Sequence, residues 1–209
     1  PKTAIVGGVT SARVSSQCWK RAVRELLIDE KESEFGAVFK GKRGRWIIDK
    51  FDSSLKTAGE DNSKALAICI GHYLAKIDSK NPSRVKTSLF LSSMELNAIS
   101  HGVLALEKEK KAKLVDAVEK VNLSEIEKEA ENDEQDTDEI GDDKKSKVSK
   151  DEKMSPKKFT KLVESTLKSV FNNIYKKDDV KKLPKDASDI AIFGRMVAND
   201  SSLNIEGAA

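Results

Sequence analysis

Three polar side chains of the types that bind phosphate recur at helical spacing near the start of the chain. Gln17, Lys20 and Arg24 belong to the segment VSSQCWKRAVREL. A helix turns about 100° per residue, which places the three within about 60° of one another. Ser15 and Ser16 are candidate N-caps at the helix end where free amide groups and the helix dipole favour an anion. The pattern predicts a helix face that binds phosphate groups.

Two further cations, Lys2 and Arg13, lie just upstream and are expected to contact the same phosphates. Phosphate contacts fix the position of a nucleic acid without reading its bases. Binding should therefore show little sequence preference and weaken steeply with salt. The alternative is an ordinary amphipathic helix whose charged face is merely solvated. The residue pattern on its own leaves both interpretations open.

The helix that positions these side chains is predicted to run from Ser15 or Ser16 to about residue 30. A short β-prone run over residues 3–6 precedes it and ends at Gly7-Gly8. Apolar residues recur at three- and four-residue steps on the side opposite the polar face. This predicted buried face consists of Trp19, Ala22, Val23, Leu26 and Leu27.

Helical periodicity continues through much of the remaining chain. Ser92 and Glu95 fit a capping box, and Ser155 followed by Pro156 marks another helix start. Helices are predicted over residues 63–76, 93–111, 112–121 and 156–174. The other predicted segments are a loop over 36–60, a turn at the Asn-Pro pair of 78–83, a strand over 87–91, and a strand or buried extended segment over 188–197.

Charge is distributed unevenly along the chain. Residues 125–143 hold eleven acidic residues and one lysine, although the whole chain carries a net charge of +3. The rest of the chain is therefore strongly basic, which favours a polyanionic partner. Residues 122–153 contain few aliphatic and no aromatic side chains, so we expect a disordered or mobile insert there.

The sequence contains no pattern typical of a catalytic or metal site. The two histidines, His72 and His101, lie in predicted helices without an evident partner, and no phosphate loop or paired-cysteine zinc pattern is present. No catalytic residue, metal or cofactor is expected. Cys18 and Cys69 occupy apolar helical positions, which indicates a reduced, cytoplasmic setting. No apolar run of about 18 residues or export signal is apparent, so no membrane association is expected.

Four stretches of the chain resemble the CasC family, which supplies the repeated backbone subunit of the type I-E CRISPR Cascade complex. They are AIVGG at 4–8, ARVSSQCWKRAVR at 12–24, TSLFLSSMELNAI at 87–99 and DIAIFGRMVAND at 189–200. Their order and separation also fit the family.

The resemblance implies an α+β fold, mainly α in this chain, with a partial RRM-like (ferredoxin-like) palm and an inserted helical domain. Residues 1–35 would form part of the palm with the RNA-facing helix. Residues 36–183 would form the helical fingers, including the insert at 122–153, and residues 184–209 would return to the palm. The expected first palm strand, its N-R-D turn and the thumb loop are not in this sequence, so the resemblance implies a fragment.

The resemblance also implies a role as a scaffold that binds CRISPR guide RNA and polymerises along it in antiviral defence. Its partners would be the guide RNA, neighbouring copies of itself, other Cascade subunits and, through the guide, target DNA. Lys2, Ser15, Gln17, Lys20 and Arg24 would contact the guide backbone. Arg195 and Met196 match the family's palm block, in which the methionine lies against the bases beside a flipped-out nucleotide. The residue pattern alone favours a core position for Met196.

Two rival functions remain. One is a helical protein-interaction module that docks an acidic partner on its basic face. The other is a phosphate-processing enzyme, which the absence of a metal or nucleophile cluster disfavours.

Overall fold

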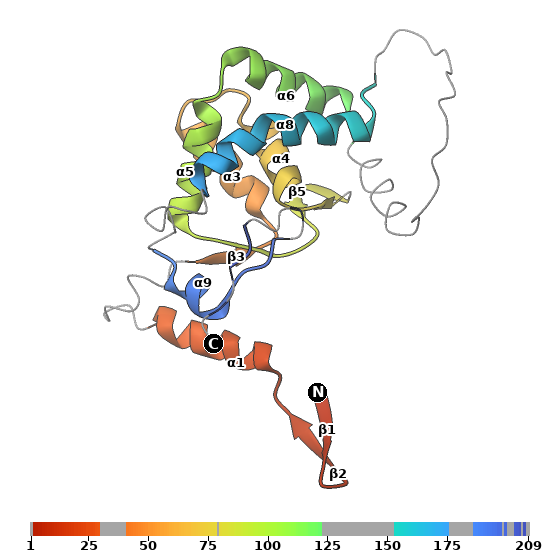
Figure 1. Ribbon diagram of the computed structural model, residues 1–209, viewed down its shortest axis with the longest axis vertical. Helices are drawn as coiled ribbons and strands as arrows, with labels where there is room; N and C mark the ends of the chain where they lie inside the picture. The colour runs from red at the N-terminus through yellow and green to blue at the C-terminus, as the bar shows by residue number, and fades with distance from the viewer. Residues whose placement is uncertain are drawn as a thin grey trace.

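Five helices pack around a common apolar core in the computed structural model, which describes residues 2–29, 41–78, 80–122, 153–175, 186–197, 199, 203–205 and 207 (Figure 1). They are α3 (Ile47–Thr57), α4 (Ser63–Leu74), α5 (Ser93–Leu104), α6 (Lys108–Lys120) and α8 (Pro156–Ile174). The largest side chains of the core include Phe51, Phe159 and Phe171, each with at most 1% of its surface exposed. The predicted insert at 122–153 falls almost wholly outside the described residues.

Helix α4 is the centre of this body, since it packs against α3, α6 and α8. Five consecutive residues, from Leu66 to Ile70, are buried, so α4 has apolar side chains around its whole circumference. A helix of this kind needs neighbours on every side. Gly71 allows α3 to approach closely, because a Cβ at this position would lie 2.5 Å from Cγ1 of Ile48.

Three antiparallel two-stranded ribbons accompany the helices. The β1 (Lys2–Val6) and β2 (Val9–Arg13) strands form a hairpin, β3 (Lys42–Gly44) pairs with β6 (Leu89–Leu91), and β4 (Ile77–Asp78) pairs with β5 (Asn81–Val85). The fold is thus mixed α+β and mostly helical, as predicted. The RRM-like palm sheet is not shown in the described parts of the chain.

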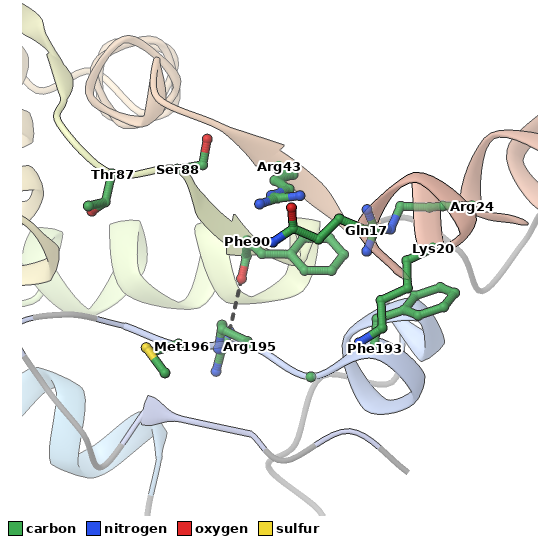
Figure 2. A pocket seen from close by; sticks show the side chains of 11 residues that line it. Gln17, Lys20, Arg24, Arg43, Thr87, Ser88, Phe90, Phe193, Arg195 and Met196 are labelled. Atoms are coloured by element: carbon green, nitrogen blue, oxygen red, sulfur yellow. Dashed lines mark hydrogen bonds between the residues drawn. The ribbon is translucent and has the colours of Figure 1, made fainter. Parts of the chain in front are cut away.

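Helix α1 (Ser16–Asp29) and the short helix α9 (Ser188–Phe193) lie at the end of the body near the β3–β6 ribbon (Figures 1 and 2). The β1–β2 hairpin extends beyond α1, away from the helical core (Figure 1). Nearly all of its residues are exposed.

Several predicted elements are confirmed, namely the strand at 3–6, the helices at 16–29, 63–74 and 156–174, the strand at 89–91 and the Ser92–Glu95 capping box. Glu95 N donates to Oγ of Ser92 at 3.0 Å, and Ser92 N donates to Oε2 of Glu95 at 2.8 Å. The break predicted at 78–83 is confirmed, because β4 and β5 form a hairpin there and Asn81 and Pro82 begin its second strand.

Three predictions were wrong. The loop predicted over 36–60 includes β3 and α3, because Ile47, Ile48, Phe51 and Leu55 form a buried helical stripe within a polar segment. The helix predicted to reach residue 111 ends at Leu104, since Glu107 has extended backbone angles before α6. The segment at 188–193 is helix α9 rather than a strand, and Gly194 ends it.

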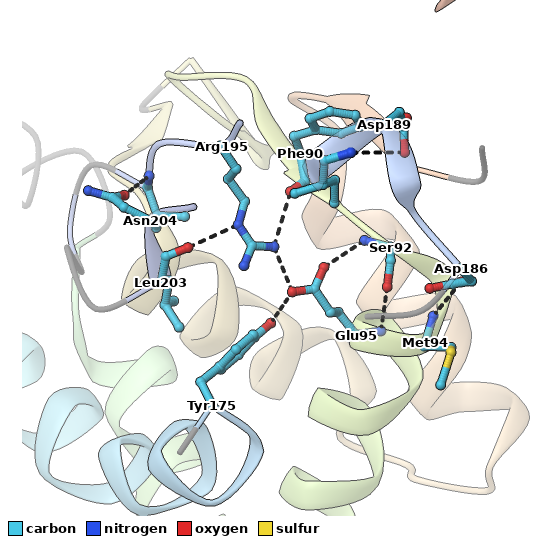
Figure 3. A network of polar contacts seen from close by, with 12 residues as sticks. Phe90, Ser92, Met94, Glu95, Tyr175, Asp186, Asp189, Arg195, Leu203 and Asn204 are labelled. Atoms are coloured by element: carbon cyan, nitrogen blue, oxygen red, sulfur yellow. Dashed lines mark hydrogen bonds and ion pairs between the residues drawn. The ribbon is translucent and has the colours of Figure 1, made fainter. Parts of the chain in front are cut away.

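A buried polar network connects the C-terminal segment to the helical body (Figure 3). Nη1 of Arg195 lies 2.6 Å from Oε1 of Glu95 on α5, with 1% and 3% of the two side chains exposed. Arg195 also donates to the carbonyl oxygens of Leu203 and Phe90 at 3.0 and 3.4 Å. The Tyr175 hydroxyl donates to the same Glu95 oxygen at 2.9 Å. Burial and the Glu95 carboxylate raise the pKa of Tyr175, so its phenol remains protonated.

Removing one partner of this pair should destabilise the protein strongly. Arg195→Met leaves a buried carboxylate without its cation, and we expect the free energy of unfolding to fall by about 3–5 kcal/mol in urea denaturation. The double variant Arg195→Met/Glu95→Gln should lose less than the sum of the single variants. Strict additivity of the single effects would contradict direct pairing.

A second prediction concerns His72, which is buried on α4. Its Nε2 lies 3.0 Å from Oγ1 of Thr160, its Nδ1 has no hydrogen-bond partner among the described residues, and burial lowers its pKa to about 4. The unfolded chain takes up a proton near pH 6.5, whereas the folded chain does not. Stability should therefore decline between about pH 6.5 and pH 4, by at most about 1.4 kcal/mol per pH unit.

The measurement is urea unfolding across this pH range. His72→Gln should flatten the decline, while the matched variant His101→Gln, on an exposed position of α5, should retain it. Equal flattening in both variants would show that His72 is not the source.

Candidate nucleic-acid interface

An open groove of about 360 Å³ lies between α1, the β3–β6 ribbon and the segment that follows α9 (Figure 2). Its walls combine cations, aromatic rings and small polar side chains. The lining residues are Gln17, Lys20, Arg24, Arg43, Thr87, Ser88, Phe90, Phe193, Gly194, Arg195 and Met196. Segments far apart in the sequence thus meet at one surface.

Helix α1 contributes the three polar side chains predicted to share a face. Gln17, Lys20 and Arg24 all line the groove. Ser15 is the N-cap of α1, because its Oγ accepts a hydrogen bond from the amide of Cys18 at 3.2 Å. Ser16 is the first helical residue rather than the cap.

The Arg24 guanidinium is held between two aromatic rings. Its Cζ lies 4.9 Å from the ring centroid of Phe90 and 4.8 Å from that of Phe193. Arginine stacks favourably on aromatic faces. Burial lowers the pKa of Arg24, an effect that the Asp189 carboxylate opposes. The rings thereby hold the cation in one orientation at the wall of the groove.

Asp189 lies behind this arginine in a buried position on α9. Its Oδ1 accepts from the amide of Ile190 at 3.2 Å, and its Oδ2 has no partner among the described residues. Burial raises the pKa of Asp189, while the Gly41 amide and the Arg24 charge oppose this shift. Asp189 is not among the residues that line the groove, whereas Lys20 and Arg43 are.

Consecutive residues after α9 point in opposite directions. The Arg195 side chain turns inward to Glu95, so its guanidinium is committed to the protein interior in this conformation. The Met196 side chain is 81% exposed at the groove, and the core position suggested by the residue pattern is therefore wrong. Gly194 directs this turn with φ 72° and ψ 169°, a conformation that essentially only glycine adopts.

Lys2 and Arg13 do not line the groove. They face each other across the β1–β2 hairpin as the first and last residues of its register, and both are exposed. The predicted common site is therefore divided between a groove beside α1 and a pair of cations on the hairpin.

The apolar face of α1 is exposed rather than buried, which contradicts the prediction. Trp19 and Leu26 are each 63% exposed, and Val23 is 42% exposed. The described residues place no element against this side of the helix, whereas the polar side with Arg24 faces the β3–β6 ribbon and α9.

The groove residues that sequence reasoning missed include Arg43, Phe90 and Phe193. Arg43 and Phe90 lie opposite each other in the β3–β6 register, so their side chains share one face of the ribbon. Strand β6 was predicted, but β3 was not, and the pairing between them is long-range. Strand alternation could have predicted the position of Phe90, because it points Phe90 to the face opposite the one that Leu89 and Leu91 share.

The described residues also bear on two other kinds of site, a metal centre and a membrane span. Those residues contain no group of three or more His, Cys, Asp or Glu side chains that could hold a metal ion. None of the described helices is long and apolar enough to cross a membrane.

Comparison with known proteins gives one match. A family model described as CT1975-like protein matches residues 1–209, the whole of the sequence. No curated protein and no solved structure matches the chain significantly. Because the family model covers every residue, including all the stretches that build the groove, the chain belongs to the CT1975-like family, the CRISPR-associated CasC family of type I-E.

Proposed function

We propose that this chain is a guide-RNA-binding backbone subunit of a Cascade-type complex and that the groove beside α1 holds the sugar-phosphate backbone of the guide. Membership of the CasC family supports the role. The observation that carries the assignment of the site is the convergence of Lys20, Arg24 and Arg43 with two aromatic rings and an exposed methionine.

Each side chain has a distinct part in this proposal. Lys20 and Arg43 neutralise phosphates, and Gln17 adds a neutral hydrogen bond. The two aromatic rings fix the orientation of the Arg24 guanidinium. Little side-chain entropy is therefore lost when its N–H groups bind a phosphate. Met196 offers an apolar surface to a base, while Arg195 acts indirectly by holding the segment that carries Met196.

The remaining predicted contacts extend this site. Lys2 and Arg13 belong to the β1–β2 hairpin, and Ser15 caps α1. The hairpin and α1 lie at the same end of the molecule (Figure 1), so these residues would follow the guide beyond the groove. An RRM-like palm, formed by the hairpin and α1 together with further strands, belongs to the proposal.

The proposed mechanism is positioning rather than catalysis. Neighbouring copies would bind successive segments of one guide, other Cascade subunits would join this filament, and target DNA would be reached through the guide. The proposal gives the chain no catalytic group.

A protein-docking role is the second candidate, and the exposed apolar side of α1 favours it. Trp19, Val23 and Leu26 form this side, opposite the groove. Exposed apolar clusters mark contact surfaces for other proteins. Since the two faces are separate, a partner subunit on this side is compatible with RNA on the other.

The RNA contact is tested by replacing two groove cations. Lys20→Gln/Arg43→Gln should weaken binding of single-stranded RNA about tenfold or more in fluorescence polarisation, because two charged contacts to phosphate are lost. The slope of the logarithm of the binding constant against the logarithm of the salt concentration should become shallower by about 1.4, because each lost phosphate contact contributes about 0.7.

The matched control is Lys113→Gln/Lys161→Gln, which removes the same charge from exposed positions of α6 and α8. It should bind RNA almost as tightly as the unmodified chain. Equal losses in the two double variants would show that general basicity, rather than the groove, retains RNA.

A further inference from the structure

A second basic cavity lies on the helical body, apart from the groove. It is an open pocket of about 440 Å³ between β3, the start of α3 and the start of α5. The residues that matter are Lys42, Trp46, Asp49, Lys50, Ser93 and Asn97. Side chains alternate along a strand, so Lys42 and its neighbour Arg43 project from opposite faces of β3. The two cavities therefore lie on opposite sides of the same ribbon.

Two ammonium groups share this pocket without a carboxylate of their own. In the described parts of the chain, no ion pair involves Lys42 or Lys50. Asp49 also lines the pocket, but its Oδ1 lies 2.8 Å from Nζ of Lys64, which compensates its charge. Lys50 belongs to the first turn of α3, where the positive end of the helix dipole disfavours a cation.

The electrostatics of Lys50 show the same imbalance. Burial lowers its pKa, and the nearby Lys42 charge lowers it further. The repulsion between these two charges is unfavourable in the free protein, and an anion that binds between the two lysines would reduce it.

An aromatic ring completes the pocket. Trp46 is 50% exposed, and the Arg84 guanidinium lies 5.9 Å from its ring centroid. Arg84 is itself paired with Asp78 at 2.6 Å. The ring thus offers a stacking surface beside the two lysines, and Ser93 and Asn97 offer neutral hydrogen-bonding groups.

We propose that this pocket binds a nucleotide unit, with phosphate oxygens between Lys42 and Lys50 and the base against Trp46. Lysine is a compact point charge suited to phosphate, and every base has a face that can stack on an aromatic ring. The unit has two possible sources, a free nucleoside triphosphate or one nucleotide of a strand. The site is independent of the groove beside α1.

The test uses Trp46 fluorescence in a Trp19→Phe background, where Trp46 is the only tryptophan. Tripolyphosphate, ATP, a 12-nucleotide single-stranded RNA and polyglutamate are titrated separately. ATP or the RNA should change the fluorescence in a saturable way, and polyglutamate should not. A response to ATP identifies the free nucleotide as ligand, and a response to the RNA alone identifies a strand. Tripolyphosphate should displace either ligand at higher concentration.

Two variants make the test specific. Lys42→Gln/Lys50→Gln should weaken the response about tenfold or more, because two charged contacts to phosphate are lost. The matched control Lys56→Gln/Lys113→Gln, at exposed positions, should keep it. Lys20→Gln/Arg43→Gln should also keep it, which separates this proposal from guide binding. No response to ATP or RNA, an equal response to polyglutamate, or equal weakening in the control would overturn the proposal.

Discussion

The structure around the groove depends on one buried ion pair, Arg195 with Glu95. A charge pair removed from water is tolerated only when its remaining hydrogen-bonding groups are also satisfied. Here a tyrosine hydroxyl, a capping amide and two carbonyl groups meet this requirement. Because these groups come from β6, α5, α8 and the segment around Leu203, the pair joins four parts of the chain at one point.

This constraint also explains how the groove is formed. With Arg195 directed inward, Gly194 and Met196 are placed at the surface, and α9 is held so that Phe193 faces Phe90 across Arg24. The cation that sequence spacing assigns to phosphate binding is thereby oriented by two rings before any ligand arrives. Preorganisation of this kind suits a scaffold whose task is to position RNA rather than to transform it.

Sequence reasoning predicted the parts of this site that depend on local spacing. The shared face of Gln17, Lys20 and Arg24 follows from helical geometry, and the Ser92–Glu95 capping box follows from a three-residue separation. The Arg24 contacts with Phe90 and Phe193 could not be predicted, because they join residues distant in sequence. The apolar stripe of α1 was misassigned, since periodicity shows that a helix has two faces but not which face meets the rest of the chain. Helix α3 was missed because glycine and charged residues surround its short apolar stripe.

The central claim, that the groove beside α1 holds the guide backbone, is tested most directly by ultraviolet cross-linking. The chain is bound to single-stranded RNA that contains 4-thiouridine, irradiated, and digested for mass spectrometry. The account predicts cross-linked peptides that contain Met196, the exposed groove residue proposed to lie against a base. Cross-links confined to peptides of α6 and α8, with none at the groove, would contradict it.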